Sequence, residues 1–562
     1  NVFRRYGMKK AMSMITTGIV CSLLLVLAAS CGQAKQAGAG AEKGDPNYPI
    51  TISVFTFQNQ QTPPEDNKIY KWMKEKFNVT FKWDITVGQK DQKIGTMIAA
   101  QDYPDLLLVD GVKFIEAGAL IPLEDLIEKY GPNLKKHYAS VWEQMKEDDG
   151  HIYCLPNWGV IDGEYRSSYY GGSALWIQKA VLKEFGYPKI TTMDEYFDLI
   201  EKYKAKYPTI NGLPTIGFTI LTYDWRVFCL INPPNFLAGN PNDGNVIVNK
   251  KTFDAKVFLG LDISKRWFKK LNEMNAKGLI DRSCFVDNYD QYMAKLSSGR
   301  VLGIHDQYWQ FQDATAALLN QNLYQHSMAP LPIVFEKGIK PWYRDRPLPN
   351  LRRGYGISIK AKDPVRIIRF LDAQLSEEAQ KVFQWGFLNE DYQLDAKGVP
   401  YRTEEQRKQQ DDPVWKLRNK AELWFGDAPK MEGTFSDGNP TGIADVPGEA
   451  LAIQREEDAE LLKAYGVSSF AELMDKNPPE NPIYYPAWQL TPPDGSPAQI
   501  AWKKAEDLYR KYLPRIILAR PAQFDALWDE YVAELNKVGL EEYEKFMTEE
   551  IKKRVTKWSV KK

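Results

Sequence analysis

Ile50-Thr-Ile-Ser-Val-Phe-Thr-Phe57 is an apolar-rich run that predicts a β-strand at the start of the folded part of the chain. Residues 67–77 then place apolar side chains near one helical face, and residues 79–85 alternate in the way of a second strand. A further helical stretch over 91–100 leads through a Pro-Asp turn into the apolar run Leu106-Leu-Leu-Val109. Strands that alternate with helices at this spacing predict a parallel sheet, so the expected fold class is α/β.

Further along the chain, two helix starts carry clear capping signals. Thr192-Met-Asp-Glu195 has the pattern of a capping box, and Asp363-Pro364 combines a good N-cap residue with proline at the first helical position. From Ala501 the chain reads as mostly helical to its end. More than 500 residues follow the first 45, which is more than one hydrophobic core usually holds, so two or more domains are expected.

The first 48 residues read as a targeting segment followed by a tether. Residues 1–30 combine basic residues, a short apolar run and small residues before Cys31, as in a secretory signal peptide. The apolar run is shorter than a membrane span, which needs about 20 residues. Small residues directly before a cysteine resemble the bacterial lipobox, so Cys31 is the expected lipidation site; the alternative is an ordinary signal peptide with an accidental cysteine. Residues 33–45 have no large apolar side chain, which predicts a flexible tether over 31–48.

The composition of the chain excludes several classes of function. Lys plus Arg equals Asp plus Glu at 73 each, so no overall charge favours nucleic acid as a partner. Beyond the targeting segment only Cys154, Cys229 and Cys284 remain, an odd number without the spacing of a zinc site or a disulfide framework. The four histidines form no metal-binding pattern. The 16 Trp and 30 Tyr residues, by contrast, provide rings on which a carbohydrate can stack.

A series of short segments carries a resemblance to a known family. They are Met97–Leu106, Glu116–Leu123, Asp149–Pro156, Leu175–Gln178, Lys277–Asp281, Ser298–Gly303 and the stretch 390–403. In this order they are similar to signatures of the extracellular solute-binding proteins of bacterial ABC importers. The group they resemble is the carbohydrate-type family 1, which is related to maltose- and alginate-binding proteins. The similarity runs from about residue 50 to the C-terminus.

The resemblance implies a periplasmic-binding-protein-like (type II) fold, in which two α/β lobes are joined by a hinge with a ligand cleft between them. By this analogy the first lobe holds residues 49–165 and returns near 345–400, and the second holds 170–330 with much of 405–562. The implied protein is a binding protein rather than an enzyme, a monomer held by lipid at the extracellular face of the cell membrane. It would capture a carbohydrate, in particular an oligosaccharide, and deliver it to ABC permease subunits that depend on a separate ATPase.

One departure from the family concerns a metal. Members near the alginate-binding branch often hold a structural calcium ion in an Asp/Asn-rich loop that follows a helix with a capping box. The equivalent stretch here, Lys206–Pro214, keeps Asn211 but lacks acidic residues. Calcium takes about six to eight oxygen ligands, mostly carboxylates. We therefore expect no calcium at this loop, and neither another metal nor a cofactor elsewhere.

Candidate ligand contacts follow from a rule of open α/β sheets, in which ligands bind beyond the carboxyl ends of the strands. A sugar has an apolar face that packs on aromatic rings and a hydroxyl rim that pairs with Asp, Asn and Arg side chains. The aromatic candidates could instead pack in the core, the aspartates could cap helices or lie in surface turns, and the arginine could form an ion pair. The candidates are Asn59, Asp110, Trp158, Tyr169, Tyr170, Trp225, Asp306, Trp309, Arg353 and Tyr355.

Two other classes of function stay open. A secreted carbohydrate-active enzyme would need a pair of carboxylates across the scissile bond, and with 73 acidic residues no pair stands out. The chain also lacks the Gly-x-Ser-x-Gly pattern of a nucleophile elbow. The third class is a tethered sugar-sensing subunit that presents its ligand-bound surface to a receptor.

Overall fold

The computed structural model describes residues 46–58, 61–86, 89–157, 170–345 and 350–559. The predicted signal peptide, Cys31 and most of the predicted tether lie outside these residues, as do the candidates Asn59, Trp158 and Tyr169. Among the described helices, none is both long enough and apolar enough to span a membrane.

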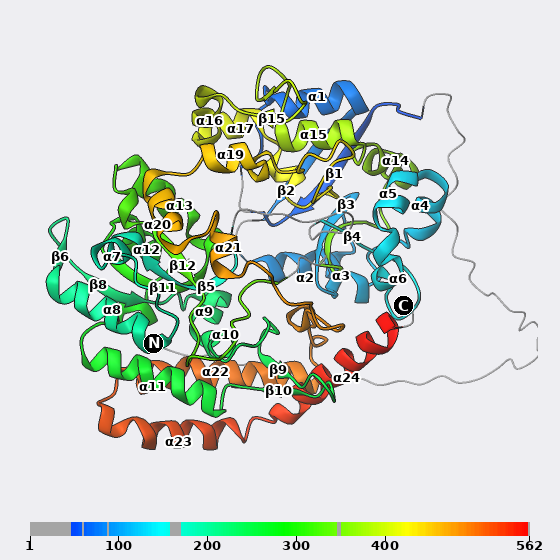
Figure 1. The fold of residues 1–562 in the computed structure, drawn as a ribbon. Coiled ribbons are helices and arrows are strands. Elements are labelled where there is room, and N and C mark those ends of the chain that lie inside the picture. The colour runs from blue at the N-terminus through cyan, green and yellow to red at the C-terminus, as the bar shows by residue number, and fades with distance from the viewer. Residues whose placement is uncertain (1–45, 59–60, 87–88, 158–169, 346–349, 560–562) are drawn as a thin grey trace, which may run out of the picture. The chain divides into compact units, whose positions relative to one another are not determined.

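The first sheet combines the strands that the sequence predicts at 50–57, 79–85 and 106–109 with the short strand β4 and with one strand from much later in the chain. In the described residues its strand order is β2-β1-β3-β13-β4 (Figure 1). β1 runs parallel to β2 and β3, whereas β13 is antiparallel to β3 and β4. The strands are β1 (Ile50–Thr56), β2 (Val79–Ile85), β3 (Leu106–Asp110), β4 (Leu155–Pro156) and β13 (Arg353–Ile357).

The helix α1 (Lys68–Phe77) shows how the local sequence builds this part of the fold. Asn67 caps its start, because the side-chain oxygen accepts hydrogen bonds from the backbone N–H of Ile69 and of Tyr70, each at 3.0 Å. Ile69, Met73 and Phe77 are buried at a spacing of four residues, so one face of α1 packs into the first core.

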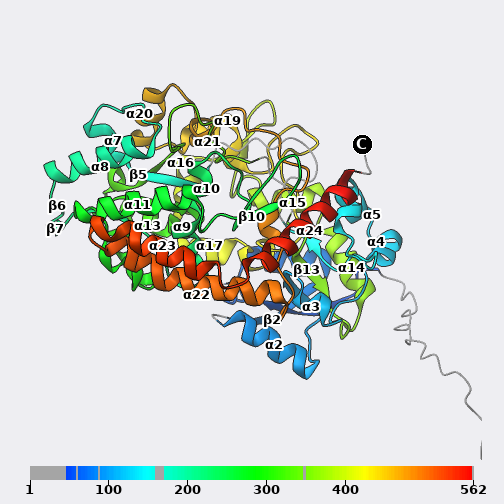
Figure 2. The ribbon, with the colours of Figure 1, turned by 90° about the horizontal axis from the view of Figure 1, so that it is seen from below.

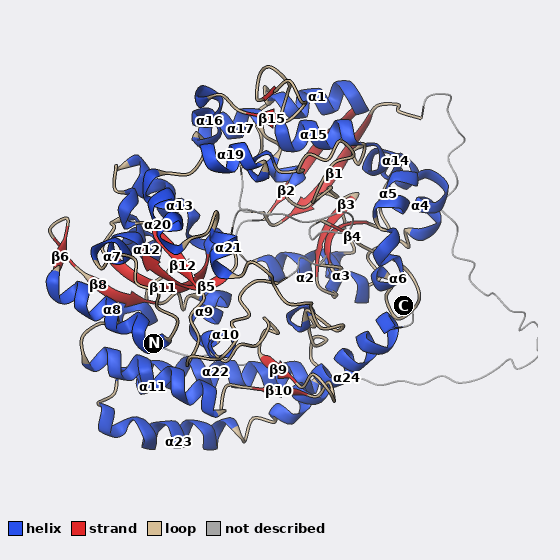
Figure 3. Cartoon of the chain, viewed as in Figure 1, coloured by secondary structure: helices blue, strands red, loops and turns tan. Residues whose placement is uncertain are grey.

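The second sheet has the order β12-β5-β11-β8 in the described residues (Figure 3). β8 and β11 are parallel, and β5 runs antiparallel to both β11 and β12. The predicted capping box is present at the start of α8 (Met193–Lys206), which covers this sheet with buried side chains such as Tyr196. The strands are β5 (Ser173–Gln178), β8 (Ile216–Thr219), β11 (Val301–Gln307) and β12 (Met328–Leu331).

Each sheet has its own hydrophobic core. Buried residues such as Ile52 and Leu108 belong to the first, and residues such as Trp176 and Phe218 belong to the second. The chain leaves the first sheet after β4, forms the second sheet from β5 to β12, and returns to the first as β13. The two sheets therefore pack into separate hydrophobic cores within one compact unit, Pro46–Lys562.

The part of the chain after β13 divides between the two cores. Trp424, in α18 (Glu422–Phe425), is fully buried in the first core, where its ring stacks on Tyr355 at 5.0 Å. Ile443 and Val446 lie in a small cluster beside the first core. The second core resumes with α20 (Glu456–Tyr465), so residues 456–559 join it whereas residues 421–446 do not.

The C-terminal helices complete the second core (Figure 2). α22 (Pro497–Leu518) packs against both α24 (Leu540–Ser559) and α11 (Asp262–Ala276). Asn272 of α11 is buried, and its amide nitrogen donates to the carbonyl oxygens at the end of α22, including Ile516 at 3.0 Å. The helical character predicted from Ala501 onwards is confirmed.

Candidate functional site

The carboxyl edge of the first sheet gathers polar side chains from several strands. Gln58, Asp110 and Asn157 follow or end β1, β3 and β4. Arg353 begins β13, and because β13 is antiparallel to β3, its register partner is Asp110. This edge is where a ligand is expected in an open α/β sheet.

Ion pairs connect the charged residues of this edge. Lys90, the first residue of α2 (Lys90–Ala100), places its ammonium 2.8 Å from a carboxylate oxygen of Asp110. Arg353 lies 3.5 Å from the same oxygen and 3.2 Å from a carboxylate oxygen of Asp427. Both cations also lie over the ring of Phe57, at 4.8 Å for Lys90 and 5.4 Å for Arg353.

The positive charges at this edge favour the ionised form of Asp110. Burial raises the pKa of Asp110, but the positive charges of Lys90 and Arg353 outweigh burial, so its pKa lies below the usual value. We call Gln58, Lys90, Asp110, Asn157, Arg353 and Asp427 the first-sheet polar cluster. It offers charged donors and acceptors that are already oriented by one another.

The carboxyl edge of the second sheet carries an exposed aromatic pair. Trp225 lies in a 3₁₀ turn shortly after β8, and Trp309 lies in the first turn of α13 (Tyr308–Asn320), directly after β11. Their ring centroids are 6.0 Å apart with planes 10° from parallel. Trp225 is 57% exposed and Trp309 is 46% exposed, unlike the buried rings of the core. We call these two residues the tryptophan pair.

Neighbouring side chains fix the orientation of the tryptophan pair. The indole N–H of Trp309 donates to the side-chain oxygen of Gln307 at 2.6 Å. Trp225 stacks on Phe228 at 5.9 Å, and the guanidinium of Arg226 lies 4.7 Å from its ring. The rings are thus held in place on their protein side while their exposed surface stays in solvent.

Two tyrosine candidates lie in the core, so the prediction that they contact a ligand is wrong. Tyr355 is fully buried against Trp424, because successive side chains of β13 alternate and this one faces the first core. Tyr170 is 7% exposed, and its hydroxyl donates to the carbonyl oxygen of Ser173 at 2.6 Å. Both rings are packing residues, which is the alternative that the sequence left open.

Asp306 is also buried, so the prediction that it contacts a ligand is wrong as well. Its carboxylate accepts hydrogen bonds from the Tyr292 hydroxyl at 2.7 Å, from the Gln310 amide at 2.5 Å and from the backbone N–H of Gln307 at 2.7 Å. Burial raises its pKa to about 6. Asp306 therefore braces the end of β11, shortly before Trp309 in the chain, rather than facing solvent.

Several residues of the site are not among the candidates named from sequence. Asn157 directly precedes Trp158 at a strand end, so the strand-end rule applied one residue earlier would have found it. Lys90 begins a helix and Asp427 follows one far along the chain, and neither position carries a local signal.

The Lys206–Pro214 stretch, where the sequence predicts no calcium site, forms a small hairpin. β6 (Thr209–Ile210) and β7 (Leu213–Pro214) are joined by Asn211 and Gly212, which have φ of 52° and 75°. Positive φ at both central residues is the geometry of a tight hairpin turn. No group of three or more His, Cys, Asp or Glu in the described residues is placed to hold a metal ion.

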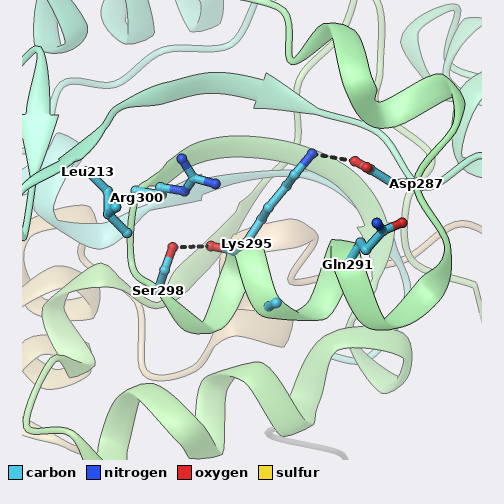
Figure 4. Close-up of a pocket in the computed structure, with 7 residues that line it drawn as sticks. Leu213, Asp287, Gln291, Lys295, Ser298 and Arg300 are labelled. Carbon is cyan, nitrogen blue, oxygen red and sulfur yellow. Dashed lines mark hydrogen bonds and ion pairs between the residues drawn. The ribbon is translucent and has the colours of Figure 1, made fainter.

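A pocket of about 320 Å³ lies apart from the carboxyl edges, along one face of α12 (Tyr289–Ser297) (Figure 4). Two of the residues that line the pocket come shortly before strands of the second sheet: Leu213 before β8 and Arg300 before β11. Lys295 lines the pocket and forms an ion pair with Asp287, which Figure 4 shows, and another with Asp281 at 2.6 Å. The tryptophan pair follows the opposite ends of the same two strands.

The three cysteines of the folded part are buried and free. Burial raises the pKa of the thiols of Cys154, Cys229 and Cys284. A thiol needs its ionised form to act as a nucleophile, so these thiols are inert in this environment.

Among curated proteins, the chain is similar to the fructooligosaccharide ABC transporter substrate-binding protein FusA of Streptococcus pneumoniae. The two are 24% identical over 568 residues, which cover 94% of this chain and 96% of the relative.

Solved structures share the fold over most of the chain. An alginate-binding protein without calcium ion has a TM-score of 0.62 at 18% identity, covering 90% of this chain and 98% of its own. FusA of S. pneumoniae in complex with kestose has a TM-score of 0.61 at 20% identity, covering 90% and 100%. An HMO-binding solute-binding protein from Bifidobacterium longum infantis has a TM-score of 0.59 at 18% identity, covering 90% and 98%.

These structures confirm the periplasmic-binding-protein-like fold that the sequence predicts. The family model of the bacterial extracellular solute-binding proteins matches residues 68–388, which is more than half of the chain. The chain therefore belongs to the bacterial extracellular solute-binding protein family.

Proposed function

We propose that this chain is the substrate-binding protein of an ABC importer and that it captures an oligosaccharide between its two α/β lobes. The observation that carries the proposal is the tryptophan pair: two nearly parallel indoles, about half exposed, beyond the carboxyl ends of β8 and β11. Contact between large exposed apolar rings and water is unfavourable. A pyranose face that packs on the rings would remove this contact. The family membership and the oligosaccharide named for FusA support the same reading.

The proposed site has two halves with different tasks. The tryptophan pair of the second sheet takes the apolar faces of the sugar rings, and Asp110 and Arg353 of the first-sheet polar cluster pair with the hydroxyl rim. Asn59, Trp158 and Tyr169 remain proposed contacts outside the described residues. A micromolar site of this kind would supply about −8 kcal/mol.

Binding is coupled to lobe closure in this proposal. A ligand that contacts both halves gains more free energy in the closed state than in the open state, so it shifts the population toward closure. The closed form then delivers the sugar to the permease subunits, which rely on a separate ATPase for energy.

An oligosaccharide panel tests the proposal against the enzyme alternative. We expect kestose or another neutral oligosaccharide to raise the melting temperature of the purified protein and to be recovered with its chain length unchanged in chromatography. Cleaved products would favour an enzyme. A panel in which no sugar shifts the melting temperature would contradict carbohydrate binding.

We further propose that Cys31 carries the lipid that holds the protein at the extracellular face of the membrane, with residues 31–48 as the tether. The support is the run of small residues before Cys31 and the absence of large apolar residues over 33–45. In cells fed a labelled fatty acid, we expect label on the wild-type protein and none on Cys31→Ser. Equal labelling of both proteins would rule out this anchor.

A further inference from the structure

Asp427 reaches the carboxyl edge of the first sheet from a segment that is not part of the sheet. It follows α18 and is 1% exposed, so its carboxylate is removed from solvent. Trp424, three residues earlier, anchors this segment in the first core through its stack on Tyr355. The position of Asp427 is therefore set by core packing rather than by a mobile loop.

The contacts of Asp427 reach the ends of three different strands. One carboxylate oxygen lies 3.2 Å from the guanidinium of Arg353 at the start of β13 and accepts from the amide of Asn157, after β4, at 2.9 Å. The other oxygen accepts from the amide of Gln58, which follows β1. A single buried acid thus holds one cation and two amides of the first-sheet polar cluster.

The chemistry of burial makes these contacts strict. A carboxylate without solvent must be paired and hydrogen-bonded, so each partner of Asp427 is held in one orientation. Arg353 keeps 25% of its side chain exposed, which leaves part of its guanidinium available at the surface. Its remaining ion-pair partner, Asp110, is at 3.5 Å and is shared with Lys90 at 2.8 Å. Without Asp427, that shared partner and the ring of Phe57 at 5.4 Å would be left to orient Arg353.

We propose that Asp427 is a positioning residue of the oligosaccharide site. It does not touch the sugar; it orients Arg353 toward the ligand and ties the ends of β1 and β4 to the same point. The inference rests on the proposed function and adds that the segment around α18 is part of the binding site.

Asp427→Asn tests the role because it removes the charge and keeps the shape. With the sugar identified in the panel, or kestose as the first probe, we expect isothermal titration to give an affinity about tenfold weaker than that of the wild-type protein. A double-mutant cycle with Arg353→Gln supplies the decisive readout. Since Asp427 acts through Arg353, the double variant should bind no more weakly than Arg353→Gln alone.

Asp372→Asn is the matched control. Asp372 is another buried carboxylate on the first core, and it accepts from the backbone N–H of Leu134 at 2.9 Å, on α5 (Pro132–His137), rather than from the carboxyl edge. We expect this variant to lose stability and to keep wild-type affinity. If Asp427→Asn does not fold, Asn157→Ala replaces it. Asn157 is 3% exposed, and this variant removes the amide that donates to Asp427 and to the carbonyl oxygen of Gly426.

The outcomes separate the two proposals. If the wild-type protein binds the sugar and Asp427→Asn binds it with the same affinity, the positioning role is overturned and the proposed function stands. Equal losses of affinity in Asp427→Asn and Asp372→Asn, or additive losses in the cycle with Arg353, would overturn it as well. A wild-type protein that binds no sugar would overturn the proposed function and this inference together.

Discussion

Replacement of both Trp225 and Trp309 by alanine is expected to weaken oligosaccharide binding by on the order of 100-fold or more. Aromatic residues at the centre of an interface typically contribute about 2 kcal/mol or more each, and about 1.4 kcal/mol corresponds to a tenfold change in affinity. Both rings are about half exposed in the structure, so their removal leaves no cavity in the core and the fold should persist. Isothermal titration with the sugar found in the panel measures the effect.

The single variants and a control sharpen this prediction. Because the two rings stack on each other at 6.0 Å, each single replacement also disturbs the remaining ring, and the two losses should not add. Trp415→Ala, on α17 (Pro413–Asn419), removes a partly buried indole that belongs neither to the tryptophan pair nor to the first-sheet polar cluster, and it should leave affinity within about twofold. Normal binding by the double variant would place the sugar site elsewhere.

Trp424→Ala is expected to lower the free energy of unfolding of the first lobe by about 3–5 kcal/mol. The indole is fully buried, stacks on Tyr355 at 5.0 Å and lies 4.7 Å from the ring of Phe81. Its N–H donates to the side chain of Gln374 at 2.8 Å, so truncation also leaves a buried acceptor without a partner. Urea denaturation monitored by circular dichroism gives the change in stability.

Trp415→Ala serves again as the comparison, since its partly buried ring should cost less than half as much stability as Trp424. An unfolding midpoint of Trp424→Ala equal to that of the wild-type protein would show that the segment around α18 does not stabilise the first core. A shared early transition in both variants would point instead to local unfolding of residues 413–425.

The elements of the fold could be predicted from sequence where the signal is local. The strand β1, the helix α1 and the capping box at Thr192 depend on alternation, helical spacing and a side chain that reaches its own backbone. The site was predictable in part, since the rule of strand ends nominated the tryptophan pair, Asp110 and Arg353. Those residues lie at the carboxyl edges of the two sheets.

Other residues of the site could not be judged without the tertiary structure. Tyr355 and Asp306 stand near strand ends like the exposed candidates, but their side chains point into the cores, and one residue of register decides between the two outcomes. Asp427 joins Arg353 only because the segment around α18 packs back on the first sheet, a contact between residues 74 positions apart.

The sequence by itself determined the α/β class and the alternation of strands and helices. It also provides the aromatic residues on which a sugar can stack. These follow from periodicity and composition, which act between near neighbours in the chain. The tertiary structure alone decided which rings are exposed, which acids are buried and how the segment after β13 divides between the two cores. Burial and charge pairing depend on contacts between distant segments, whose free energy is not encoded in any local pattern.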